Sequence, residues 1–268
     1  MAAQRQGDSR GPERGRETGP WLDDLVSELD LRRQLPPSLV ESSTDLTGLA
    51  AAIVQCRKCP RLVVWREKVA SQKRASFVDE EYWGKAVPGF GDPDARLLVV
   101  GLAPAAHGAN RTGRMFTGDR SGDWLYRALH TAGFANQPTS TDRNDGLVLA
   151  DAWVTSPVRC APPDNKPLPT ERDACAPYLA KEIELLVNKQ VIVCLGQYGF
   201  LATWRFLTAQ GYVMPKPRPK FAHGGSVAVS DLTIVMSYHP SQQNTFTGRL
   251  TEPMFDDVFA VASARLRV

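Results

Sequence analysis

Four of the five cysteines in this sequence form two pairs whose residue type and spacing suit metal binding. Cys56 and Cys59 make a Cys-x-x-Cys motif, and Cys160 and Cys175 lie farther along the chain with fourteen residues between them. Four thiolates hold either one tetrahedral zinc ion or an iron-sulfur cluster, so the spacing predicts a metal site without deciding between the two. The alternative is four unconnected buried thiols, the interpretation that we give to Cys194, which lies in an apolar run.

Two polar loops are the next candidates for chemistry. The first, residues 101–119 (GLAPAAHGANRTGRMFTGD), is rich in small residues that let a backbone approach a flat ligand closely. It lacks the Gly-Lys-Ser/Thr of a nucleotide P-loop and the glycine pattern of a dinucleotide site. The second, residues 237–251 (SYHPSQQNTFTGRLT), is polar and follows the last apolar run.

Four short apolar runs must position these loops. They are continuous rather than alternating, which is typical of strands with both faces buried, and cover residues 96–101, 149–154, 191–196 and 233–238. Helical segments lie between them, including residues 124–132 and 178–186. This order predicts an α/β protein with a central, mainly parallel four-stranded sheet covered by helices on both faces. Ligands bind outside the carboxyl ends of such strands, so we expect chemistry in the loops that begin at Gly101, Thr155, Gly196 and Tyr238.

Length and composition limit the class of protein. The chain has 268 residues, 43% hydrophobic and 23% charged, and no apolar run approaches the ~18 residues of a membrane span. Residues 1–20 are polar and predict a disordered tail, and residues 21–268 predict a single domain. A short amphipathic helix is expected over residues 22–29 and another after Asp45. The N-terminus has no secretory signal, so we expect a reducing cytoplasm.

The net charge of +3 is too small to demonstrate a polyanionic partner. One stretch, residues 57–74, concentrates seven basic residues against the single acid Glu67. It predicts either a phosphate-binding face or an ordinary solvated helix face. The biased segment 215–220 (PKPRPK) is expected to be an exposed basic loop.

The two loop motifs and the four paired cysteines together resemble the uracil-DNA glycosylase superfamily, specifically its family 5, over about residues 50–262. The resemblance implies a three-layer α/β/α fold and a 4Fe-4S cluster on Cys56, Cys59, Cys160 and Cys175. It implies excision of uracil and other deaminated bases, such as hypoxanthine, from DNA, which initiates base excision repair. The implied protein is a monomer at the nucleoid, acting on DNA that we expect to be double-stranded. Contact of the tail with a sliding clamp is left open.

The resemblance also implies roles for single residues. His239 stabilises the base as it leaves, and Phe116 stacks on the flipped base. Asn165 matches the adjacent N–H and C=O of uracil with one amide acceptor and one donor, a pair that hypoxanthine also presents. Ala103, Ala105 and His107 complete the base site. Each polar or aromatic residue has a structural alternative: His239 and Asn165 as turn residues, Phe116 as core, and His107 as a partner of backbone groups.

One departure from the superfamily concerns the carboxylate. Where other members keep Asp, Asn or Glu just after the first strand, this sequence has Leu102, Ala103 and Ala105, which cannot orient water. Asp119 is the nearest substitute, to activate water or to stabilise the cationic sugar, and Asp123 is the second choice. Asp119 also suits the N-cap of a helix that begins near Ser121.

Residues 241–251 are expected to contact DNA at the gap left by the flipped nucleotide or at phosphates. The contacting side chains would be Ser241, Gln243, Asn244 and Arg249. A non-catalytic zinc-containing nucleic-acid-binding protein is the alternative function, but it leaves residues 101–119 and His239 unexplained. A zinc deaminase is a third class, and its His-x-Glu and Pro-Cys-x-x-Cys pattern is absent from the sequence.

Overall fold

The computed structural model describes residues 38–266. The predicted tail over residues 1–20 and the predicted helix over residues 22–29 therefore lie outside the described residues. Across residues 38–266, no helix is both long enough and apolar enough to cross a membrane.

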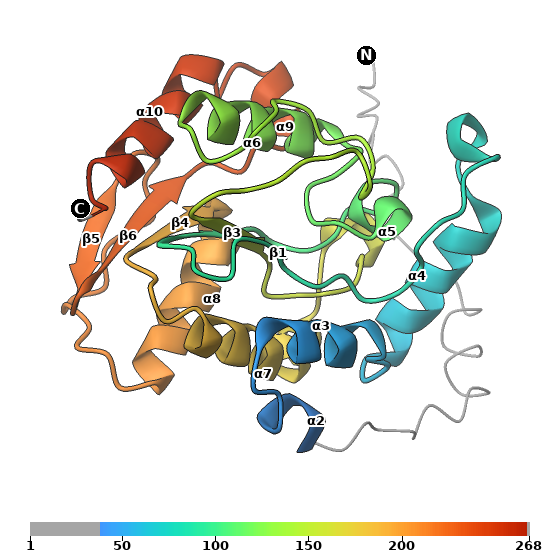
Figure 1. Ribbon diagram of the computed structural model, residues 1–268, viewed down its shortest axis with the longest axis horizontal. Coiled ribbons are helices and arrows are strands. Elements are labelled where there is room, and N and C mark those ends of the chain that lie inside the picture. The colour runs from blue at the N-terminus through green and yellow to red at the C-terminus, as the bar shows by residue number, and fades with distance from the viewer. Residues whose placement is uncertain (1–37, 267–268) are drawn as a thin grey trace, which may run out of the picture.

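A six-stranded mixed sheet, in the order β1-β3-β2-β4-β6-β5, forms the middle of the molecule (Figure 1). The strands are β1 (Phe90–Gly91), β2 (Leu97–Val100), β3 (Ala152–Thr155), β4 (Val191–Leu195), β5 (Ser226–Val229) and β6 (Leu232–Ser237). The four predicted apolar runs are β2, β3, β4 and β6, and they pair in parallel as expected.

The predicted number of strands was wrong, because short antiparallel strands extend both edges of the sheet. β1 has only two residues, and β5 has alternately exposed side chains. Neither strand contains the continuous apolar run by which the four inner strands were recognised.

Helices cover both faces of the sheet. Their bounds are α2 (Ser38–Glu41), α3 (Leu46–Val54), α4 (Pro60–Gln72), α5 (Ala109–Thr112), α6 (Arg120–Thr131), α7 (Pro169–Leu185), α8 (Gly196–Ala209), α9 (Gln242–Phe246) and α10 (Glu252–Ser263), with 3-10 turns at Ala75–Phe77 and Pro163–Asn165. The helices predicted over residues 124–132 and 178–186 correspond to α6 and α7. The helix predicted after Asp45 is α3, and the Asp45 side chain caps it by accepting a hydrogen bond from the Gly48 N–H at 2.7 Å.

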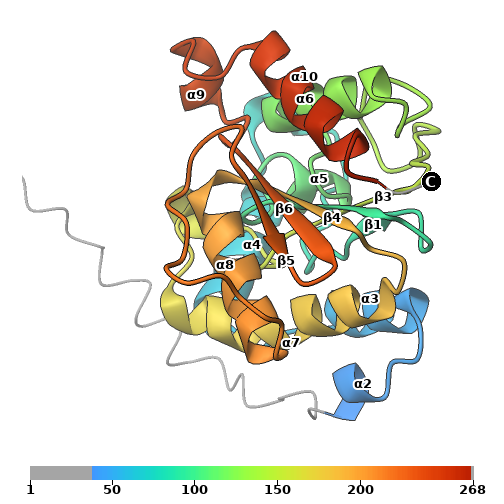
Figure 2. The same ribbon diagram turned by 90° about the vertical axis from the view of Figure 1, so that its left-hand side faces the viewer.

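Successive side chains of each inner strand point into opposite cores. Leu97 and Val99 of β2 pack with α6 and α10 on one face, whereas Leu98 and Val100 pack with α7 and α8 on the other. Figures 1 and 2 show these helices as two layers enclosing the sheet, so the expected three-layer α/β/α fold is confirmed. A third, smaller core lies between α3, α4 and α7.

The strand order reverses at β2, between β3 and β4, so the sheet has a topological switch point there. From β2 the chain passes to β3 on one side of it, and then returns to β4 on the other side. The loops that follow β2 and β4 therefore leave in opposite directions, which is the arrangement in which open α/β sheets bind ligands.

Candidate active site

Loops from two strands meet through the aromatic rings of Phe116 and His239. The ring centroids are 5.7 Å apart and the planes are inclined by 29°. The Phe116 ring also lies on Gly101, where an added methyl group would stand only 2.6 Å from it. Phe116 has a φ of 53°, a conformation that is unusual for a residue with a side chain. The ring is therefore held between the end of β2 and the histidine that follows β6.

His239 is a neutral imidazole in the loop that follows β6. Burial lowers its pKa to about 4, so the ring carries no charge at neutral pH. Within residues 38–266 its ring nitrogens make no hydrogen bond, which leaves them available to a ligand. Its backbone is fixed instead, because the Asn244 side chain donates to the His239 carbonyl at 2.8 Å.

Asp119 is the N-cap of α6, so the predicted capping role is confirmed. Its side chain accepts a hydrogen bond from the Gly122 N–H at 3.1 Å. The carboxylate lies so close to Gly108 that a methyl group there would stand 1.9 Å from Oδ2. Burial raises the pKa of Asp119, and the backbone N–H groups of α6 act in the opposite direction. Asp123, by contrast, is exposed on the first turn of α6.

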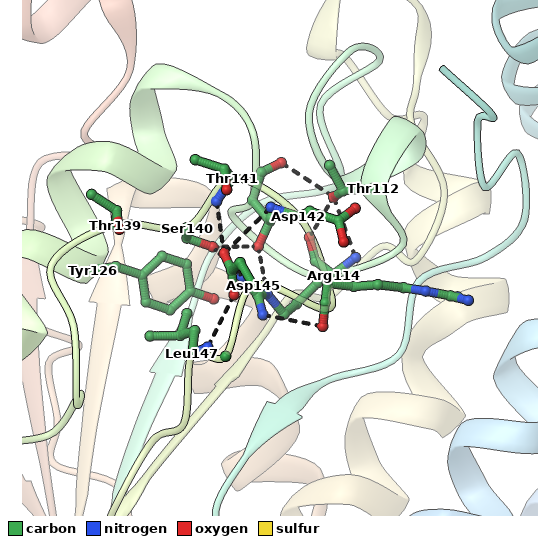
Figure 3. A network of polar contacts seen from close by, with 12 residues as sticks. Thr112, Arg114, Tyr126, Thr139, Ser140, Thr141, Asp142, Asp145 and Leu147 are labelled. Atoms are coloured by element: carbon green, nitrogen blue, oxygen red, sulfur yellow. Dashed lines mark hydrogen bonds and ion pairs between the residues drawn. The ribbon is translucent and has the colours of Figure 1, made fainter. Parts of the chain in front are cut away.

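Arg114 anchors the loop that carries Phe116 through a network of polar contacts, part of which Figure 3 shows. The Arg114 guanidinium is 4% exposed and donates to Thr117 Oγ1 at 2.9 Å, to Ser140 Oγ at 2.8 Å and to Asp145 Oδ2 at 2.7 Å. Burial alone would raise the pKa of Asp145, but the bonds from Arg114 and from backbone N–H groups hold it at about 2. Residues 140–147 are thus part of the site's framework, a contribution that sequence analysis missed.

The remaining predicted base-site residues lie in different surroundings. The Nδ1 atom of His107 and the Tyr82 hydroxyl are 3.0 Å apart, and burial, followed by Arg74 and Arg111, lowers the pKa of His107. Ala103 and Ala105 are partly exposed in the first loop. Asn165 ends a 3-10 turn with a φ of 56° and is exposed, and its amide makes no hydrogen bond to the described part of the chain. No measured contact tests its predicted role.

Two of the four predicted DNA-contacting side chains stabilise their own segment. Ser241 caps α9 by accepting from the Asn244 N–H, and Asn244 holds the His239 carbonyl. Gln243 and Arg249 are exposed, and the Arg249 guanidinium lies 4.5 Å from the centroid of the Tyr238 ring. Their contact with DNA stays a prediction.

A pair that sequence analysis missed lies beside these residues. Phe246, the last residue of α9, is 69% exposed, and the Arg120 guanidinium lies 4.7 Å from the centroid of its ring. Arg120 directly follows Asp119, so the pair joins α9 to the start of α6. The available signal was the aromatic Phe246 within the polar segment 241–247.

The four paired cysteines line one enclosed cavity, together with Lys58, Leu62, Val63, Arg159 and Ala174. The four cysteines are free thiols and form no disulfide with one another. Cys56 follows α3 and Cys59 caps α4, so the motif lies in the connection between two helices and not within one helical turn. No group of three or more His, Cys, Asp or Glu side chains between residues 38 and 266 is arranged to hold a single metal ion. Cys194, as expected, is buried elsewhere, in β4.

Two thiols of this cavity, those of Cys59 and Cys160, are difficult to ionise in the absence of a cation. Burial raises the pKa of Cys59 to about 12 and that of Cys160 to about 11. Arg66 opposes the shift at Cys160, because its guanidinium donates to Cys160 Sγ at 2.9 Å. Since metals bind thiolates, a bound cation would have to supply the missing stabilisation.

The basic stretch at residues 57–74 is partly engaged by the protein itself, and its predicted binding of phosphates stays a prediction. Arg57 pairs with Glu67, Arg61 pairs with Glu171, and Arg66 is buried beside the cysteines. Three of its seven cations are therefore engaged by protein groups, a pairing that the local sequence could not reveal because Glu171 is distant in the chain.

Comparison with known proteins identifies the class. Residues 88–262 match a family model described as the Uracil DNA glycosylase superfamily, and the chain belongs to this superfamily. Proteins named Type-5 uracil-DNA glycosylase are 51% identical in Mycobacterium tuberculosis (84% of this chain, 83% of that protein) and 47% identical in Thermus thermophilus (81% and 97%). A relative of the same name in Pyrobaculum aerophilum is 42% identical over 79% of this chain and 89% of its own, whereas a Type-4 relative from that organism is 27% identical.

The pKa of His239 gives a prediction for titration. In an NMR titration, the His239 imidazole should remain neutral at pH 6 and protonate with a midpoint near 4, whereas an unfolded histidine titrates near ~6.5. Because its folded pKa is the lower one, the neutral ring stabilises the fold above pH ~6.5, and this contribution is lost as the pH falls toward 4. The imidazole signal that disappears in a His239→Gln variant is assigned to His239. A midpoint at or above 6 would contradict the buried site described here.

Proposed function

We propose that this protein excises uracil from DNA by hydrolysing the N-glycosidic bond, as the first step of base excision repair. The observation that carries the proposal is the contact of the Phe116 ring with the neutral His239 at the carboxyl edge of the sheet. The Type-5 names of the relatives support the same activity. A non-catalytic zinc protein would leave this arrangement without a purpose.

Base recognition and departure follow from this ring pair. A flipped base that stacks on Phe116 comes within reach of the His239 imidazole, whose nitrogens have no protein partner among the described residues. As the glycosidic bond breaks, negative charge accumulates on the carbonyl oxygens of the base. A neutral imidazole N–H donates to that oxygen and stabilises it, with no need for a proton from solvent.

Asp119 supplies the carboxylate in this proposal. Burial raises its pKa, which makes its carboxylate a better base than that of an exposed aspartate. From the start of α6 it activates the attacking water or stabilises the positive charge that develops on the sugar. The helix fixes one oxygen, and the other lies against Gly108 on the same loop.

The base specificity that we propose is broad. Uracil and hypoxanthine both present an adjacent N–H and C=O, and the exposed Asn165 amide offers a matching acceptor and donor. Asn165 would reach the base only when DNA is bound. Removal of hypoxanthine as well as uracil belongs to the same proposal.

The DNA that we propose as substrate is double-stranded, bound by one copy of the chain at the nucleoid. Phe246 and Gln243 project from α9, next to the loop that holds His239. An exposed aromatic side chain fills the gap left by a flipped nucleotide and stacks on its neighbours. The Arg120 guanidinium lies over the Phe246 ring in a cation–π contact, which restricts the ring's position. A clamp contact of residues 1–20 stays a prediction.

A 4Fe-4S cluster is the cofactor that we propose for the cysteine cavity. The feature that supports it is the gathering of four free thiols around one enclosed space. The four sulfurs of a zinc site lie within about 3.8 Å of each other, whereas each cysteine of a cluster binds a different iron. Hydrolysis needs no electron transfer, so the cluster would hold α4, α7 and the segment after β3 together.

The role of Asp119 is tested by Asp119→Asn. Asparagine caps helices as well as aspartate does, so folding and DNA binding should be retained, while single-turnover uracil excision falls by about 100- to 10,000-fold. The matched control is Asp123→Asn on the exposed first turn, which should excise at the wild-type rate. Loss of activity in the control and not in Asp119→Asn would move the carboxylate role to Asp123.

The role of Phe246 is tested on two substrates. Phe246→Ala should reduce excision from duplex DNA about tenfold, because a stacking ring is lost, and should affect single-stranded DNA much less, because no base pair has to open. Val187→Ala, at an exposed position before β4, is the control and should change neither rate. Equal losses on both substrates would argue against the duplex-opening role.

The cofactor is tested by metal analysis. Wild-type protein should be brown and contain about four iron atoms per chain. Cys59→Ser should lower the iron content and the melting temperature, whereas Cys194→Ala should keep its iron, since Cys194 lies in β4 away from the cavity. A colourless protein that carries zinc would disprove the cluster and leave the glycosylase proposal intact.

A further inference from the structure

Arg66 lies in the interior of the protein beside the cysteine cavity. Its side chain is 1% exposed. One terminal nitrogen donates to Cys160 Sγ at 2.9 Å and the other to the Cys56 carbonyl at 3.0 Å. The Nε atom is buried and has no hydrogen-bond partner within the described residues.

The absence of a carboxylate partner separates Arg66 from the other buried arginines. Residues 38–266 hold four arginines that are at most 8% exposed: Arg66, Arg111, Arg114 and Arg159. Three of them form ion pairs, with Glu80, Asp145 and Glu182 in that order. Arg66 forms none with any described residue, and its two polar partners belong to the paired cysteines.

A buried guanidinium without a negative partner strongly destabilises a fold. The groups next to Arg66 that can provide negative charge are the cavity cysteines, since its guanidinium donates to Cys160 Sγ. Four thiolates around the doubly positive core of an oxidised 4Fe-4S cluster leave a net charge of about −2. The positive charge of Arg66 is therefore compensated when the cavity holds such a negatively charged group.

We propose that Arg66 is the internal counter-ion of the metal group bound by Cys56, Cys59, Cys160 and Cys175. This inference rests on the proposed cofactor and not on the excision chemistry. By donating to Cys160 Sγ, Arg66 stabilises the thiolate and withdraws electron density from it. A positive charge at this position retains the bound metal and favours its reduced state.

Arg66 also connects the cavity to the first active-site loop. The Asn110 side chain, fully buried in α5, donates to the Arg66 carbonyl at 3.2 Å. α5 lies within the loop that runs from Gly101 to Asp119. The counter-ion role therefore places one residue of α4 in contact with both the cysteines and the loop.

The test compares three variants of the full-length, metal-loaded protein. Arg66→Met removes the charge and keeps an unbranched side chain. Arg66→Lys keeps the charge but lacks the planar set of N–H donors of a guanidinium. Arg57→Met is the matched control, because Arg57 adjoins Cys56 but is 44% exposed and screened by water. The measurements are iron per chain, the rate at which visible absorption decays with an iron chelator, and the midpoint potential of the cluster.

Arg66→Met should lose its visible absorption about 10- to 100-fold faster than wild type, and its midpoint potential should shift to a lower value. Arg66→Lys should recover much of both, and Arg57→Met should match the wild type. An unchanged potential and lifetime in Arg66→Met, or a failure of Lys to restore either, would overturn the counter-ion role in favour of packing alone.

The outcomes also separate this inference from the proposals on which it depends. If the wild type carries zinc, the cluster proposal fails, and the rate of zinc loss to a chelator decides the role of Arg66 in the same three variants. If the wild type binds no metal, both the cofactor and the counter-ion role are wrong. Uracil excision, measured on the same preparations, tests the proposed activity independently.

Discussion

The burial of every side chain on both faces of β2, β3 and β4 is the constraint on which the rest of the molecule depends. β2, β3 and β4 have no exposed position, so they can present no polar group along their length. Polar chemistry must begin where these strands end. Since β2, β3, β4 and β6 run in parallel, their carboxyl ends lie at one edge, and the loops that follow them meet there.

Rigid surroundings then fix the geometry of that edge. Phe116 keeps its unusual backbone conformation because its ring rests on Gly101 and because Arg114 ties the loop to the segment containing Asp145. Such a site loses little conformational entropy when it takes up a base, since the side chains are already ordered. A buried network of charged hydrogen bonds is costly if incomplete, and every terminal nitrogen of Arg114 has an acceptor.

Much of this was predictable from the sequence, for identifiable reasons. Continuous apolar runs reveal strands buried on both faces, and two distinctive motifs revealed the loops containing Phe116 and His239. The short edge strands were missed because one has two residues and the other an alternating pattern. Long-range pairing was missed too: a basic stretch resembles a surface, and nothing local shows that Arg61 meets Glu171 or that Arg66 turns inward.

Asp119 caps a helix and, in the function proposed above, also serves the reaction, so two separate demands fall on it. Aspartate, asparagine, serine and threonine all satisfy the first, because each accepts the N–H bond that begins α6. Only a carboxylate satisfies the second. A substitution at this position can therefore abolish activity without unfolding the protein. A descendant with serine here would stay folded, and it could evolve to bind damaged bases without removing them.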